Sequence, residues 1–252
     1  MNKMLIFDIE GSIAHFRKFY TNSSSLSYAF PPRTVITGLL AGILGYERDT
    51  YYEIFSSRNC NIGLAIKKPI RKLVQTVNYI KTKELKEVTG SAGHTQVPIE
   101  FVVPQIGEEL LRYRVYFFHK YENIIHNLKE KVMNGDIKYP PYLGITECPA
   151  KISLVNEGDV FWVKGTKNSF GIITVISVDK IEKIDFQEEY RYIKEDRVPV
   201  EFTSERRIKK ISSYIYEQNC KPIVNIKIKG EIFCVTYIDG EKRVEEYGVF
   251  ME

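Results

Sequence analysis

The first half of the chain alternates short apolar segments with two segments of helical periodicity. Residues 4–9 form an apolar run with the length and composition of a buried strand. Residues 35–43 place apolar side chains at helical spacing directly after Pro31 and Pro32, and proline favours the first turn of a helix. Residues 122–133 repeat the helical spacing. The pattern predicts a strand followed by a helix, a short second helix at residues 49–55 after Gly45, and a further helix near the middle of the chain.

Between the first helical segments and the helix predicted at 122–133 the pattern changes to strands. Residues 61–70 and 112–119 are predicted strands because their apolar positions alternate. Residues 71–103 contain two more apolar segments, which flank a polar, glycine-containing stretch at 81–96. This region is therefore predicted to be a long hairpin with a flexible tip. A disordered surface loop is the alternative for the same region.

The second half of the chain differs in character. Residues 139–149 contain three prolines and are typical of a connector. From residue 150 onward short apolar or alternating segments predominate, and Lys229-Gly230 and Asp239-Gly240 are turn signals of hairpins. This pattern predicts a mostly antiparallel β unit. It leaves open whether the unit is a separate domain or completes the sheet of the first half.

These elements together predict an α+β fold. A strand, a glycine and a helix in that order are typical of the opening of a ferredoxin-like unit. Residues 1–138 are therefore predicted to form a ferredoxin-like domain of the RNA-recognition type, with a hairpin arm at about 71–103. Residues 150–252 are predicted to form the β-rich C-terminal unit.

Composition and charge narrow the class of protein only a little. The chain has 252 residues and a formal net charge of +4, which permits a polyanionic partner without requiring one. Its four cysteines are far apart and form no CxxC pair, so we expect no structural zinc site and a reducing compartment. No signal peptide is evident and no apolar run reaches membrane-spanning length. We therefore expect a cytoplasmic protein with no membrane partner, no metal and no cofactor.

Residues 15–20, which we name the basic-aromatic turn, combine cations with aromatic rings in the sequence HFRKFY. Single-stranded RNA needs both groups, because cations bind its phosphates and flat rings stack on its unpaired bases. Serines at positions 23–25 add short polar groups that can bond a phosphate or the backbone. RNA contact is the hypothesis for this segment, and a solvated surface loop is the alternative.

The segment around this turn resembles a known family. The run FDIEGSIAHFRKFYTNSSSLSYAFPPRTVITGLLAGILG is similar to the N-terminal signature of the CRISPR-associated Cas5 family, which belongs to the RAMP superfamily, and is most similar to its subtype I-B branch. Weaker similarity continues at residues 95–98 and 142–144, and little is recognised beyond about residue 150. The matching pieces are Ala14-His15-Phe16-Arg17-Lys18, Ser25-Leu26-Ser27-Tyr28, Pro31-Pro32-Arg33-Thr34 and Gly38-Leu39-Leu40.

This resemblance implies a non-catalytic subunit that binds and caps the 5′ handle of CRISPR RNA in a type I-B surveillance (Cascade) complex, in antiviral defence. The implied partners are the CRISPR RNA, the backbone and large subunits of the complex and, indirectly, the target DNA. The predicted hairpin at 71–103 would correspond to the family's projecting arm, which reaches along the RNA.

The residues expected to contact RNA share three roles. Cations are expected at phosphates, rings at bases, and a glycine before the turn would let the backbone approach the RNA closely. Alternation places at least one of Phe16 and Phe19 in the core, and the strand arginines alternatively snorkel from a half-solvated face. The predicted RNA-binding residues are Gly11, Ser12, His15, Phe16, Arg17, Lys18, Tyr20, Ser24, Arg33, Lys81, Lys83, Lys86, Arg112 and Arg114.

Two other functions stay open at this point. Some members of the superfamily cleave RNA without a metal, and Tyr28, His119 and Lys120 are residue types that could activate a 2′-hydroxyl and hold a phosphate. Such an endoribonuclease would yield a discrete product from repeat RNA in the presence of a chelator. A general single-strand RNA-binding module would instead bind without preference for the handle sequence.

Overall fold

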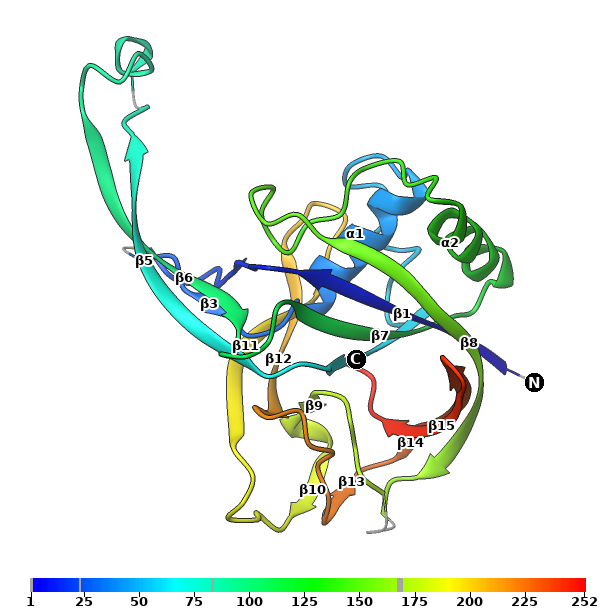
Figure 1. Ribbon diagram of the computed structural model, residues 1–252. Helices are drawn as coiled ribbons and strands as arrows, with labels where there is room; N and C mark the ends of the chain where they lie inside the picture. The colour runs from blue at the N-terminus through cyan, green and yellow to red at the C-terminus, as the bar shows by residue number, and fades with distance from the viewer. Residues whose placement is uncertain (1, 23, 83, 167–169) are drawn as a thin grey trace.

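Six antiparallel strands form a central sheet that draws on both halves of the chain (Figure 1). The computed structural model describes residues 2–22, 24–82, 84–166 and 170–252. The strands lie in the order β15-β14-β8-β1-β7-β4, and the fold is α+β as predicted. Their bounds are β1 (Asn2–Gly11), β4 (Cys60–Ile66), β7 (Leu111–His119), β8 (Lys151–Lys164), β14 (Glu231–Asp239) and β15 (Lys242–Gly248).

Strand β1 lies inside this sheet and is buried on both faces. Leu5 and Phe7 belong to the large core on the side of the helices, whereas Met4 and Ile6 belong to a second core that includes Phe233 of β14. A strand covered on both faces needs apolar side chains at successive positions. This requirement explains the continuous apolar run that predicted the strand.

Two helices cover one face of the sheet and pack against each other (Figure 1). Helix α1 (Arg33–Leu44) begins after Pro32 and ends at Gly45, whose left-handed backbone (φ 84°) lets its N–H bond the carbonyl of Ala41. Helix α2 (Glu122–Asn134) also ends at a left-handed glycine. The helices predicted at 35–43 and 122–133 are confirmed, with ends close to the predicted ones. The short helix predicted at 49–55 is wrong, because this segment forms turns between α1 and β4.

The predicted hairpin is also confirmed. Strands β5 (Ile70–Ile80) and β6 (His94–Pro104) pair along their whole length, from Ile70 opposite Pro104 to Ile80 opposite His94. The short helix η1 (Leu85–Glu87) lies in the connection at the tip. Figure 1 shows this arm projecting away from the body of the protein.

The C-terminal half contributes to the central sheet and to smaller sheets. Strands β8, β14 and β15 extend the sheet begun by β1, β4 and β7, so part of the predicted C-terminal unit completes the first sheet. The proposed division between residues 138 and 150 stays a prediction. The smaller elements are β2 (Phe16–Arg17), β3 (Ser27–Tyr28), β9 (Ile176–Ser177), η2 (Val178–Lys180), β10 (Ile181–Ile184), β11 (Tyr192–Phe202), β12 (Ile208–Glu217) and β13 (Ile226–Ile228).

Candidate nucleic-acid interface

The basic-aromatic turn is fixed to the base of the arm. Strand β2 pairs with β3, and the segment that carries them forms backbone hydrogen bonds with β6. Ala14 and Val102 exchange two such bonds of 2.9 and 2.8 Å, and the Ser25 carbonyl accepts the Glu100 N–H at 2.9 Å. Backbone hydrogen bonds therefore join the turn to the base of the arm.

The connector after α2 supports the turn from the other side. The Leu143 carbonyl accepts the His15 N–H at 3.0 Å, and Gly144 (φ 93°) lies so close that a Cβ there would collide with the His15 carbonyl. A Cβ on Gly11 would lie 2.7 Å from Leu143 Cδ1 and 3.0 Å from the Pro149 carbonyl oxygen. The close approach at Gly11 is thus to the protein itself, which does not fit the expected approach to RNA.

His15 and Phe16 are parts of the protein interior. His15 is 3% exposed, donates from Nδ1 to the Glu100 carbonyl and accepts at Nε2 from the Ser25 hydroxyl, both at 2.8 Å. Burial lowers the pKa of His15, and the nearby Arg17 lowers it further. Phe16 is buried edge-to-face against Tyr113. The expected contacts of His15 with a phosphate and of Phe16 with a base do not fit these positions.

Lys18 is engaged by an acid from the second half of the chain. Its Nζ lies 2.7 Å from Glu195 Oε2, and the same carboxylate accepts a 2.8 Å hydrogen bond from Lys72 at the base of the arm. Burial lowers the pKa of Lys18, but the hydrogen bond and charge of Glu195 outweigh it and the net pKa is raised. Lys18 therefore holds the turn against β11 while it keeps its charge.

Arg17 and Phe19 of the turn face solvent, whereas Tyr20 is half-buried against the core. Arg17 is exposed and has no hydrogen-bonding or ion-pair partner among the described residues. Phe19 is 41% exposed, and its ring packs edge-to-face on Tyr20 with centroids 5.3 Å apart. The guanidinium of Arg197, an exposed residue of β11, lies 4.6 Å from the Tyr20 ring centroid and 5.4 Å from that of Phe19.

Three other predicted arginines form ion pairs within the protein. Arg33 is 1% exposed and donates to Glu252 at 2.7 Å, so it does not fit the expected contact with a phosphate. Arg114 is buried and donates to both carboxylate oxygens of Asp8 at 2.7 and 2.9 Å. Arg112 is half-buried and paired with Glu10 at 2.6 Å. Both guanidiniums are therefore engaged by carboxylates of β1, although the Arg112 side chain stays 40% exposed.

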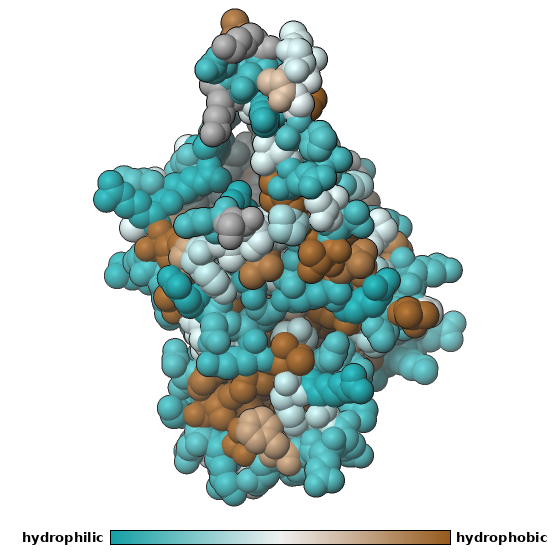
Figure 2. All heavy atoms as spheres, turned by 90° about the vertical axis from the view of Figure 1, so that its left-hand side faces the viewer, coloured by the Kyte–Doolittle hydropathy of each residue, from teal (hydrophilic) through white to brown (hydrophobic). Residues whose placement is uncertain are grey.

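The other predicted RNA contacts lie outside this core of the interface. Ser12 is exposed and Ser24 is half-buried. Lys81 is exposed near the tip of the arm. Ser23 and Lys83 lie outside the described residues, as does the side chain of Lys86. Figure 2, which views the molecule from the left of Figure 1, shows a largely hydrophilic surface with apolar patches below the arm.

The candidate nuclease residues do not converge. Tyr28 is buried, and its hydroxyl donates to the Arg197 carbonyl at 2.6 Å. Tyr113 of β7 lies near Tyr28, because its hydroxyl donates to the carbonyl of the next residue, Ala29. His119 is buried at the other end of β7, six residues from Tyr113, and six strand residues span roughly 20 Å. His119 donates from Nε2 to the Ile54 carbonyl, and burial lowers its pKa, while Lys120 is exposed. The expected catalytic triplet is not a site in this structure.

A comparison with protein families decides the identity of the chain at family level. The model described as "CRISPR-associated protein (Cas_Cas5)" matches residues 4–212. The chain belongs to the Cas5 family. The match extends well beyond residue 150, so it covers more of the chain than the resemblance drawn from the sequence. No curated protein gives a significant match.

Solved structures with CRISPR names match this Cas5-family chain at low identity and with TM-scores below 0.5. One, "CRISPR RNA-guided surveillance complex", is 11% identical, with 88% of this chain and 92% of that chain covered and a TM-score of 0.49. A CRISPR protein from Archaeoglobus fulgidus is 13% identical over 97% and 99%, with a TM-score of 0.48. A type III-B Cmr-beta structure bound to cognate target RNA is 10% identical over 87% and 85%, with a TM-score of 0.49. These scores carry no functional weight.

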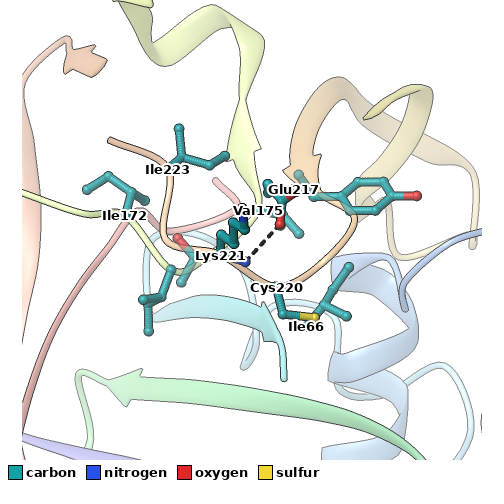
Figure 3. Close-up of a pocket in the computed structure, with 10 residues that line it drawn as sticks. Ile66, Ile172, Val175, Glu217, Cys220, Lys221 and Ile223 are labelled. Atoms are coloured by element: carbon teal, nitrogen blue, oxygen red, sulfur yellow. Dashed lines mark hydrogen bonds between the residues drawn. The ribbon is translucent and has the colours of Figure 1, made fainter. Parts of the chain in front are cut away.

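Other kinds of site are not evident in the described part of this Cas5-family chain. The described residues include no group of three or more His, Cys, Asp or Glu side chains that could hold a metal. The pocket in Figure 3, lined by Ile66, Cys220 and Lys221 among others, has an accessible volume of about 10 Å³, room for about one water. No described helix is long and apolar enough to cross a membrane.

Arg197 is the residue of the interface that the sequence did not reveal. It lies far from the turn in sequence and reaches it only through tertiary folding. The rings of Phe19 and Tyr20 were visible in the sequence, but the cation that contacts them was not. That contact arises because β11 packs beside the turn.

Proposed function

We propose that this protein is a non-catalytic RNA-binding subunit of a type I-B CRISPR surveillance (Cascade) complex, in which it holds the 5′ handle of CRISPR RNA. The observation that carries the proposal is a group of exposed side chains, Arg17 and Phe19 on the turn and Arg197 on β11, together with the half-buried ring of Tyr20. Cations and rings side by side match what single-stranded RNA offers, namely phosphates and unpaired bases.

We infer that the core is ferredoxin-like, which would suit this function. The chain path β1–α1–β4–β7–α2–β8 and the neighbour order β8-β1-β7-β4 agree with the βαββαβ arrangement. The arm is an insertion between β4 and β7, and its base bonds the basic-aromatic turn directly. We infer that arm and turn contact the same RNA strand, with the backbone and large subunits beside it and target DNA reached only through the guide.

We propose no RNA cleavage, because the candidate catalytic side chains are buried. A general base must reach the hydroxyl that it activates, within hydrogen-bonding distance or through one water. Tyr28 and His119 are both buried and bonded to the backbone: the Tyr28 hydroxyl donates to the Arg197 carbonyl, whereas His119 donates from Nε2 to the Ile54 carbonyl and accepts at Nδ1 from the Tyr121 N–H. Neither side chain is positioned to reach a bound RNA.

Purification of the tagged protein from its host, followed by sequencing of the bound RNA, tests the proposal. We expect CRISPR RNAs that share one 5′ end, together with further subunits of the complex. Recovery of unrelated single-stranded RNA without other subunits would favour a general RNA-binding module instead.

Incubation of the isolated protein with repeat RNA in a chelator tests the endoribonuclease alternative. We expect the RNA to be bound and recovered intact. A discrete cleaved handle would show that the protein processes the RNA, and replacement of His119 by Ala would then be the next variant to assay.

A further inference from the structure

Phe19, Tyr20 and Arg197, which we name the shelf, form a surface group of two rings and a guanidinium, in which Phe19 and Arg197 are exposed and Tyr20 is half-buried. The guanidinium contacts both rings, at 5.4 Å from the Phe19 centroid and 4.6 Å from that of Tyr20. The rings are perpendicular (89°), so they present a face and an edge to their surroundings. Since Phe19 is 41% exposed, part of this ring surface is open to a ligand.

The backbone under Arg197 is held in an unusual conformation. Arg197 has a left-handed φ of 56°, which is uncommon for a residue with a Cβ. It lies where the register of β11 and β12 shifts between Glu195 and Val198, and such bulges re-aim side chains. The Tyr28 hydroxyl donates to the Arg197 carbonyl at 2.6 Å and so helps to hold this geometry. Strain of this kind is concentrated at functional sites.

The charge of Arg197 is available for a ligand. The two acids next to it in β11 already have cationic partners: Glu195 binds Lys18 at 2.7 Å, and Asp196 binds Lys194 at 2.8 Å. Among the described residues no carboxylate pairs with Arg197. Arg17, likewise without a partner there, lies two positions before Phe19 in the same turn. The turn and β11 therefore supply two cations without a described partner, and one of them, Arg197, lies over the exposed Phe19 ring.

We propose that the shelf binds one unpaired nucleobase of single-stranded RNA. The base stacks on the Phe19 ring, and the Arg197 guanidinium bonds the phosphate next to it. This inference rests on the proposed function and assigns one subsite within it. A cation beside a flat apolar ring suits RNA better than a peptide, because each nucleotide offers a phosphate next to a flat base. Stacking contacts only the flat face of a base, which all four bases have, so the shelf accepts any of them.

Short single-stranded RNAs that carry 2-aminopurine at one position in turn would test the stacking. The fluorescence of this base is quenched when it stacks. We expect strong quenching at one position with the wild type and with Phe19→Tyr, which keeps the ring. Phe19→Leu should abolish the quenching and weaken binding by about 5- to 150-fold, as expected for one lost base–aromatic stack. The matched control is Phe186→Leu, another exposed phenylalanine (63%), which should change neither.

The Arg197→Lys variant keeps the positive charge but removes the planar guanidinium, so it tests the two contributions separately. We expect the salt dependence of RNA binding to be kept, because the charge is kept, and the affinity to fall, because the planar fork is lost. If Phe19→Leu and Arg197→Lys bind RNA like the wild type, the shelf only fastens the turn to β11 and the inference is wrong. That result would leave the proposed function intact, whereas a wild-type protein that binds no single-stranded RNA would contradict both.

Discussion

At the scale of single residues, the cations and histidines of this protein fall into two groups: some are buried and bonded to other protein groups, and others are exposed to solvent. His15, Lys18 and Arg33 all lie in the segment similar to the Cas5 signature, yet each spends its polar atoms on other protein groups. Arg17 alternates with Phe16 and faces solvent. Charge type alone therefore does not indicate an RNA contact here, because an ion pair inside the protein needs the same side chains.

The first residue-scale prediction concerns Arg33. Its guanidinium donates to Glu252 and to the Cys60 carbonyl, at 2.7 and 2.8 Å. Arg33→Met leaves a buried carboxylate without its partner, so we expect the free energy of unfolding to fall by about 3–5 kcal/mol in urea denaturation. The double variant Arg33→Met with Glu252→Gln should regain much of this loss. Wild-type stability in the single variant, together with weaker RNA binding, would contradict the structural role.

The second concerns pH. Burial lowers the folded-state pKa of both His15 and His119 below the ordinary value of 6.5, so the unfolded chain takes up protons first as the pH falls. Stability is therefore full above about pH 6.5 and is lost below it, by at most about 1.4 kcal/mol per pH unit for each histidine. Urea denaturation between about pH 7 and pH 5 measures this slope. His15→Gln should reduce it, whereas His94→Gln in the exposed arm should leave it unchanged.

At the scale of elements, local signals identified most of the regular structure. The prolines before α1 and the glycine after it marked the helix ends, and the polar stretch with glycines marked the tip of the arm. Their physical basis is local, because caps and turns depend on residues a few positions apart. The geometry of the candidate site was harder to predict from the sequence. The burial of His15 depends on β6, and the position of Arg197 depends on a bulge in β11. These contacts join distant segments and leave no periodic trace in the sequence.

An element-scale prediction concerns Gly144 in the connector. Gly144→Ala adds a methyl group that collides with the His15 carbonyl, and the left-handed backbone adds its own strain. Gly107 is the matched control because it is also left-handed (φ 98°) but has open space around its Cβ position. We expect Gly107→Ala to cost about 1–2 kcal/mol and Gly144→Ala to cost about 1–3 kcal/mol more, measured by urea denaturation. Equal losses would mean that the connector does not support the turn.

At the scale of the whole molecule, the sheet joins the two halves of the chain. Phe233 of β14 contacts Tyr116 of β7 with ring centroids 5.4 Å apart, and it fills the space above Gly63 of β4. Sequence patterns did not decide this point, since both a separate β domain and a shared sheet produce the same alternation. The pairing of β8 with β1 and β14 makes the sheet continuous.

This continuity predicts a single unfolding transition. We expect the full chain to unfold cooperatively in calorimetry, with equal calorimetric and van't Hoff enthalpies, because neither half completes its sheet alone. Two resolved transitions would instead support independent units divided between residues 138 and 150.

The central claim is that the exposed cation of the basic-aromatic turn binds RNA phosphate, and the salt dependence of RNA affinity tests it most directly. The slope of log affinity against log salt should be less steep by about 0.7 in Arg17→Gln than in the wild type, the value for one lost contact with single-stranded RNA. Arg243→Gln, which removes an exposed arginine from β15, should leave the slope unchanged. An unchanged slope in Arg17→Gln, or an equal change in Arg243→Gln, would contradict the claim.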